Sequence, residues 1–269
     1  MSAPSLPGAS QPGTFRPGQF RPAPGRASAG RMVVAAARQE LNALVRNSEQ
    51  LTLSFLIPLA ALIVMTLVHV ADLPEPRVNT VTPGILALAI MSASFTSQAI
   101  ITGFDRRYGV LKRLAATGFP RWLLLASKAG ATLVIIAAQF VLLCLVAWLT
   151  LDWQPRGHTA WVVLLTVLGV AVFIGLALLL GGSLRAEAVL GLANVIWLGL
   201  IGIGGVLIPL TGAPAWLRTV GAWTPADALT DGLRNVLTDG SAPGMLSIGV
   251  LLGWLAVGWL GTVRWFKWH

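Results

Sequence analysis

The sequence has few charged residues and a single cysteine. Only 11% of its 269 residues are Asp, Glu, Lys or Arg, against about 25% in an average soluble domain. The mean hydropathy is +0.76, and together these values favour an integral membrane protein. Cys144 has no second cysteine with which to form an internal disulfide or a thiolate metal cluster. Its position inside an apolar run fits a small buried side chain.

The chain also lacks the motifs of common catalytic chemistries. It has no G-x-x-x-x-G-K-[ST] phosphate-binding loop, so it does not bind ATP in that way. His69, His158 and His269 are far apart in the sequence and do not form a metal-binding motif. We therefore expect no metal, no cofactor and no catalytic residue in this chain. A membrane-embedded enzyme would need a cluster of titratable residues at one depth, and the sequence offers none.

The excess of positive charge does not point to nucleic acid. The net charge is +9, but the cations lie in short stretches between apolar runs rather than over a polar surface. The first part of the chain, 1–30, is rich in Pro, Gly, Ser and Arg, and we predict a disordered basic tail there. We expect no nucleic-acid partner.

Residues 31–50 have the pattern of an amphipathic helix. Val34, Ala37 and Leu41 recur at helical spacing, and Arg38 and Arg46 fall on the opposite face. This pattern predicts a helix lying on the inner surface of a membrane. An ordinary soluble helix is the alternative, but the sequence offers no soluble core for it to join.

Residues 51–269 contain six stretches that are free of charge and long enough to cross a membrane as helices, which takes about 20 apolar residues. They cover 51–70, 82–104, 129–151, 159–182, 188–208 and 244–263. The segment 209–240 contains several prolines and precedes the last span. We predict an all-α membrane protein with six transmembrane helices, an N-terminal interfacial amphipathic helix and a re-entrant outer hairpin before the last span.

The distribution of cations predicts the orientation of these spans. With six spans both termini lie on one side, and fifteen of the nineteen Lys and Arg residues fall on that side. Positive loops stay in the cytoplasm. We therefore expect a multi-pass protein of the plasma or inner membrane with both termini in the cytoplasm.

The densest cluster of cations is the stretch 104–121 between the second and third spans. Val110, Leu111 and Leu114 form one apolar side of a short predicted helix, flanked by Lys112 and Arg113. Binding to anionic lipid explains the charge. A compact helix that turns straight back into the membrane is also suited to dock into a groove of another protein.

Here the sequence resembles the membrane subunits of type-2 ABC exporters. Their first cytoplasmic loop carries an acid, a basic pair, a glycine, leucines at helical spacing and a Thr before the third span. The matching residues are Asp105, Arg106, Arg107, Gly109, Leu111, Lys112, Arg113, Leu114 and Thr117. A second match follows the fifth span, in the region of the predicted re-entrant hairpin: Gly204, Gly205, Pro209, Pro214, Trp216 and Pro225. The resemblance covers about residues 31–267.

The resemblance implies a coupling helix in the first loop and partners that drive it. In this family Leu111 and Leu114 would seat in a groove of an ABC ATPase subunit, present in two copies. The cations of the loop would pair with its acids or with lipid phosphates. ATP and Mg²⁺ would bind to that ATPase rather than to this chain, and a second permease copy or a homologous permease would complete the transporter.

A few polar residues lie inside the predicted spans. Gln98 and Asn194 either hold helices together, as polar residues usually do, or face a substrate path. No charge is buried at mid-membrane, which argues against an ion-coupled carrier. A glycine-rich face of the fifth span is a candidate dimer seam, formed by Gly191, Gly199, Gly202 and Gly205. We expect export of a hydrophobic drug, antibiotic or lipid-like cargo. A membrane scaffold or lipid-binding protein is the alternative.

Overall fold

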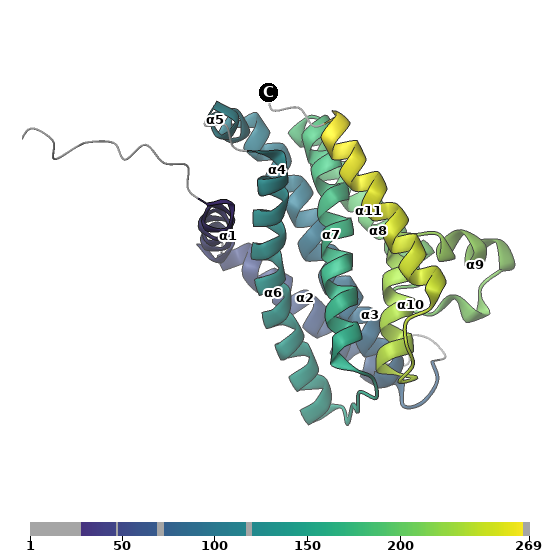
Figure 1. Ribbon diagram of the computed structural model, residues 1–269. Coiled ribbons are helices and arrows are strands. Elements are labelled where there is room, and N and C mark those ends of the chain that lie inside the picture. Colours follow the sequence, from purple (N-terminus) through teal and green to yellow (C-terminus); the bar gives the residue numbers. More distant parts are fainter. Residues whose placement is uncertain (1–27, 47, 69–72, 117–119, 266–269) are drawn as a thin grey trace, which may run out of the picture.

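The computed structural model describes residues 28–46, 48–68, 73–116 and 120–265, and nearly all of the predicted tail 1–30 lies outside them. The described residues form helices and no strands (Figure 1). The helices are α1 (Ala29–Arg46), α2 (Ser48–Leu67), α3 (Arg77–Met91), the π-helix η1 (Ser92–Thr96), α4 (Ser97–Arg107), α5 (Val110–Ala116), α6 (Arg121–Thr150), α7 (Thr159–Ser183), α8 (Ala186–Ile203), the 3₁₀-helix η2 (Leu210–Gly212), α9 (Ala215–Ala222), α10 (Pro225–Leu237) and α11 (Met245–Trp265).

Five helical segments among the described residues are long and apolar enough to cross a membrane. They are Arg77–Arg107, Trp122–Thr150, Thr159–Ser183, Ala186–Ile203 and Met245–Trp265. A shorter apolar helix covers Leu51–Leu67. The all-α membrane fold predicted from the sequence is confirmed, and the sixth span stays a prediction.

The second predicted span is one continuous helical rod made of α3, η1 and α4. Every residue from Val81 to Met91 is buried, as expected for a helix that is apolar on all sides. The rod widens into a π-helical turn at 92–96, where the Ser92 hydroxyl donates a hydrogen bond to the Leu88 carbonyl (2.8 Å). Such turns are rare and often lie at functional sites.

The helices α7 and α11 make the most extensive helix–helix contact. Their backbones approach closely at Gly175 and Gly258, where an added Cβ would come within 3.0–3.3 Å of the opposite backbone. The Thr262 hydroxyl donates to the Gly175 carbonyl at 3.0 Å. Small residues at a crossing and a hydroxyl that bonds across it are the usual means of helix association in membranes.

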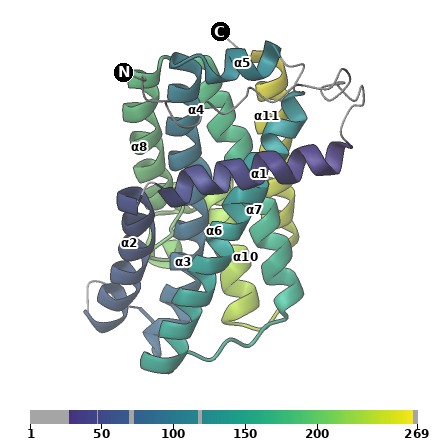
Figure 2. The same cartoon turned by 90° about the vertical axis from the view of Figure 1, so that its left-hand side faces the viewer.

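The helix α1 crosses the bundle instead of joining it (Figure 2). It packs mainly on α6, where Ala37 lies 3.6 Å from the position of a Cβ added at Gly130. Val34 and Val45 are exposed, whereas Ala37 and Leu41 are partly buried. The predicted apolar face is therefore divided: one part packs on α6, and only the other remains open.

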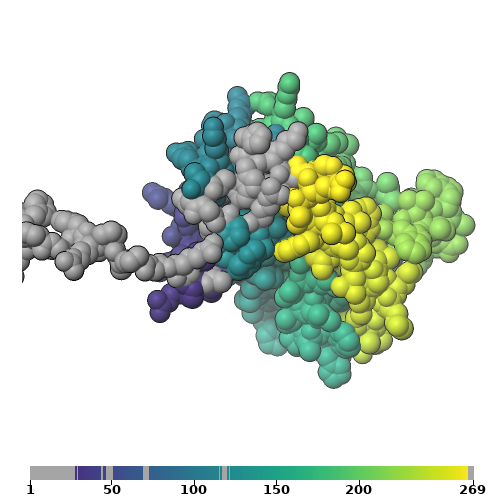
Figure 3. Space-filling model, turned by 45° about the horizontal axis from the view of Figure 1, so that its top comes forward, coloured from purple at the N-terminus to yellow at the C-terminus, as the bar shows by residue number. Residues whose placement is uncertain are grey.

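The chain breaks after α8, where the sequence predicts a re-entrant hairpin. Gly204 and Gly205 end α8, with Gly205 at φ +55. α9 then projects sideways from the bundle, which the space-filling view also shows (Figures 1 and 3). Trp216 on α9 is 67% exposed. α10 turns back among α3, α7 and α11.

Candidate functional site

The basic arm comprises residues 104–116: the end of α4, a turn and α5. It lies at the end of the bundle where α11 also finishes, beyond the level at which α1 crosses α6 (Figure 2). Gly109 has φ +71, and this backbone conformation permits the sharp turn between the two helices. The Phe104 and Tyr108 rings stack with their centroids 6.0 Å apart. The Arg113 guanidinium donates to the Tyr108 carbonyl (3.3 Å), which steadies the turn.

Two arginines of the basic arm bind the corner between α7 and α8. The Arg106 guanidinium donates to the Gly182 carbonyl at 2.6 Å and to the Leu184 carbonyl. These carbonyls end α7, where a cation is favourable. Arg107 forms an ion pair with Glu187 in the first turn of α8. Both arginines were expected to meet a partner or lipid, but they bind this chain itself.

The acid of the arm, Asp105, belongs to a charged cluster that joins three helices. Lys128 of α6 is 1% exposed, and its ammonium lies 2.5 Å from the Glu40 carboxylate of α1. The same ammonium lies 3.6 Å from the Asp105 carboxylate. A buried cation requires such partners. The basic arm is thus tied to α1, α6, α7 and α8.

The Leu111 side chain is completely buried in the core of this chain. It therefore does not lie on the surface that α5 offers to a partner, and its predicted docking role stays a prediction. Leu114 is partly buried and packs against the same core. The exposed side of α5 instead presents Lys112 and Arg113, with Tyr108 next to it at 66% exposure. Thr117 lies outside the described residues. The surface that the arm offers to a partner is therefore basic rather than leucine-rich.

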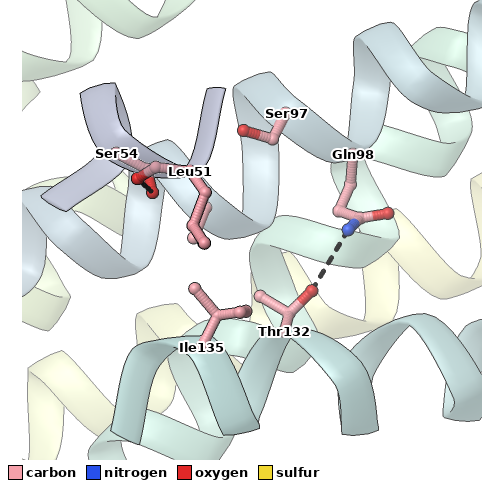
Figure 4. Close-up of a pocket in the computed structure, with 7 residues that line it drawn as sticks. Leu51, Ser54, Ser97, Gln98, Thr132 and Ile135 are labelled. Carbon is pink, nitrogen blue, oxygen red and sulfur yellow. Dashed lines mark hydrogen bonds between the residues drawn. The ribbon is translucent and has the colours of Figure 1, made fainter. Parts of the chain in front are cut away.

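Gln98 is buried between α4 and α6. Its amide donates to the Thr132 hydroxyl at 3.2 Å (Figure 4). Both residues line a small pocket with Ser54 and Ser97, and the nearby Gln139 amide donates to the Ser54 carbonyl at 2.8 Å. In this arrangement Gln98 holds helices together.

Asn194 lies on a different surface from Gln98. It is exposed on α8, and its amide donates to the Leu190 carbonyl one turn earlier (2.8 Å). The structure therefore does not bring Gln98 and Asn194 to one path. The α8 surface is open: Gly191, Gly199 and Gly202 have no atom within 4 Å of an added Cβ. Gly205 is buried against Leu210 and does not share this face.

A groove of about 1070 Å³ with several charged residues in its lining lies between α8, the loop that follows it and α10. Its key cation is Arg234, whose guanidinium donates to the Val206 carbonyl at 2.9 Å. That bond satisfies a carbonyl freed where α8 breaks. Pro225, one of the prolines of the predicted hairpin, is the first residue of α10. The residue before it, Thr224, caps the helix: its hydroxyl accepts a hydrogen bond from the Asp227 amide. Pro209 lines the groove, and the exposed Pro214 precedes α9.

Burial sets the charge of this groove. It raises the pKa of Asp227 to about 6, and the neighbouring Asp231 carboxylate adds to this rise while the Arg234 guanidinium opposes it. Burial also lowers the pKa of Arg234 to about 10. The Asp227 carboxyl therefore loses its negative charge as the pH falls through about 6, while Arg234 stays charged.

Sequence reasoning missed Lys128, Glu40 and Arg234 as site residues. The signal for Lys128 was present: apart from Arg121 at its first residue, it is the one cation of the helix 121–150, and long cations at such positions need a partner. Its partners are 88 and 23 residues away, so no local pattern could reveal them. Among the described residues, no group of three or more His, Cys, Asp or Glu is placed to hold a metal ion.

Residues 32–238 match the ABC-2 type transporter family. The match covers most of the chain, so the chain belongs to this family. It is a transmembrane permease of an ABC transporter, a class of membrane component that works with an ATPase subunit. No curated protein matches the chain as a relative.

Proposed function

We propose that the chain forms the substrate path of an ATP-driven exporter and is moved through the basic arm by a separate ATPase subunit. That subunit, in two copies, binds ATP and Mg²⁺ and carries out all of the catalysis. The observation that carries the proposal is the exposed basic side of α5 at one end of a bundle of this family. Its anchors on α6, α7 and α8 would pass a push on α5 to the spanning helices.

The contact between α5 and the ATPase can be tested with a photo-reactive amino acid at position 112. Lys112 is exposed on α5, so light is expected to link this position to an ATPase subunit in native membranes. The matched control is position 148, because Trp148 is 61% exposed near the other end of α6. Cross-links from position 112 to lipid only would contradict the docking of α5.

The open face of α8 is proposed as the seam with a second permease. Gly191, Val195 and Gly199 lie on one side of α8, and glycines let two helices approach closely. With Cys144→Ser as background, Val195→Cys is expected to form a disulfide between two copies. Val141→Cys on α6, which is equally exposed, is the control. Equal cross-linking at both positions, or none at Val195→Cys in the assembled transporter, would refute this seam.

The cargo is proposed to be a hydrophobic drug, antibiotic or lipid-like compound, exported across the plasma membrane. Support comes from two almost wholly apolar grooves of about 630 and 610 Å³ beside α6 and α7. We also propose that both termini lie in the cytoplasm. Support for the C-terminal side comes from the end of α11, which lies at the same end of the bundle as the basic arm (Figure 1), because basic segments favour the cytoplasmic side of a membrane.

A further inference from the structure

Lys128 is the feature of the molecule that the proposed function leaves unexplained. It is one of the largest completely buried side chains, although a lysine is almost never fully buried unless it is paired. Burial of a lysine at the inner end of α6 is not needed for membrane topology, because an exposed cation serves that purpose equally well. The position therefore needs a reason within the protein.

The partners of Lys128 come from segments far apart in the chain. Glu40 lies on the interfacial helix α1, and Asp105 lies on the basic arm. Glu40 is 22% and Asp105 27% exposed, so water screens this cluster only in part. Two carboxylates around one ammonium repel each other when the ammonium is removed. Lys128 is thus the charge that keeps α1 and the arm together.

The remaining contacts of α1 are weaker candidates for holding α1 and the basic arm together. α1 packs on α6 through apolar side chains such as Ala37 over Gly130, and apolar contact is non-directional. Arg38 and Val45 are exposed and hold nothing in place within the described residues. A charged bond with a short distance fixes position more strictly than apolar contact does.

We propose that Lys128 is a positioning residue that locks the interfacial helix α1 to the basic arm, so that the two move as one unit. The proposal rests on the proposed function, in which an ATPase drives the arm. In that setting, a push on α5 moves Asp105, and Lys128 passes the movement to Glu40. α1 is then a moving part of the transporter and not a passive anchor on the membrane surface.

The test measures the distance between α1 and α5 by pulsed spin-label spectroscopy on the full chain with its co-purified ATPase. Labels are placed at Arg38→Cys and Lys112→Cys, both exposed, in a Cys144→Ser background. A second pair joins Lys112→Cys to Met245→Cys at the exposed start of α11, which reports movement of the arm relative to α11. Each pair is measured without nucleotide and with ATP plus vanadate.

In the wild type we expect the 38–112 distance to stay fixed while the 112–245 distance shifts on ATP plus vanadate. Lys128→Met is expected to lose the fixed 38–112 distance, so that its distribution broadens and shifts with nucleotide. Glu40→Gln, a milder change at a partly exposed site, is expected to do the same. Gln39→Ala, its exposed neighbour on α1, is expected to behave as the wild type.

An unchanged 38–112 distance in Lys128→Met and Glu40→Gln would overturn the proposal, as would a wild-type 38–112 distance that shifts with nucleotide. If Lys128→Met fails to fold, Glu40→Gln decides. If no ATPase co-purifies with the wild type, the proposed function fails. The lock is then still tested by the static distribution in the chain alone, which broadens in Glu40→Gln if the lock exists and matches the wild type if it does not.

Discussion

Leu111→Asp is expected to destabilise the basic arm itself. The side chain is completely buried in the core, so the substitution loses apolar contacts and puts a carboxylate where no partner is available. Losing the contacts of a buried leucine costs about 2–5 kcal/mol, and an unpaired buried charge adds to this. A protein of this size loses about 2–4 °C of Tm per kcal/mol, so Tm should fall by about 10 °C.

The measurement is the Tm of the detergent-solubilised protein. It is determined from the loss of the monodisperse chromatographic peak as the sample is heated. Lys112→Asp is the matched control, because it introduces the same side chain one residue further on, at an exposed position. Its Tm should stay within a degree or two of the wild type. If Leu111→Asp keeps the wild-type Tm but loses ATPase binding, Leu111 points toward the partner after all.

Gly258→Leu is expected to separate α7 from α11. A Cβ at this position would lie 3.0 Å from the Gly175 backbone carbon and 3.1 Å from the Leu176 nitrogen. Because these are backbone atoms, a whole helix must shift to admit the side chain. The shift also breaks the hydrogen bond from Thr262 to the Gly175 carbonyl. Overpacking of this kind costs about 1–3 kcal/mol or more.

Gly253→Leu on the same helix is the control, since an added Cβ there meets no atom within 4 Å. The measured quantities are the yield of folded protein and its Tm. Gly258→Leu should lower both, and Gly253→Leu should leave both near the wild-type values. Equal behaviour of the two variants would mean that α7 and α11 do not meet at Gly258.

The helices were largely predictable from the sequence because membrane spans are coded by length and composition. The predicted spans 159–182 and 244–263 differ from α7 and α11 by one or two residues. The π-helical turn at 92–96 was not predictable, since it depends on how the central rod packs. α6 begins eight residues before its predicted span, because a helix continues beyond the membrane wherever other helices cover it.

The position of the basic arm in the chain was predicted from the sequence, but the direction in which its side chains point was not. Sequence places the basic arm between the second and third spans, and the structure agrees. Yet the sequence pattern around an apolar residue such as Leu111 is the same whether the side chain packs into the core of its own chain or contacts a partner protein. Charges are equally ambiguous: Arg106 fits lipid, a partner or the carbonyls at the end of α7. Only tertiary structure, which brings Gly182 beside Arg106, separates these alternatives.

The central claim is that the exposed basic side of α5 engages an ATPase, and co-purification tests it most directly. The tagged chain would be purified from its native membranes, and vanadate-sensitive ATP hydrolysis measured in the eluate. The wild type is compared with Lys112→Glu/Arg113→Glu, and Arg31→Glu on the exposed side of α1 controls for the change of charge. We expect an ATPase and its activity with the wild type and Arg31→Glu, and loss of both with the double variant. ATPase activity retained by the double variant, or absent from the wild type, would contradict the claim and favour a lipid-binding role for the arm.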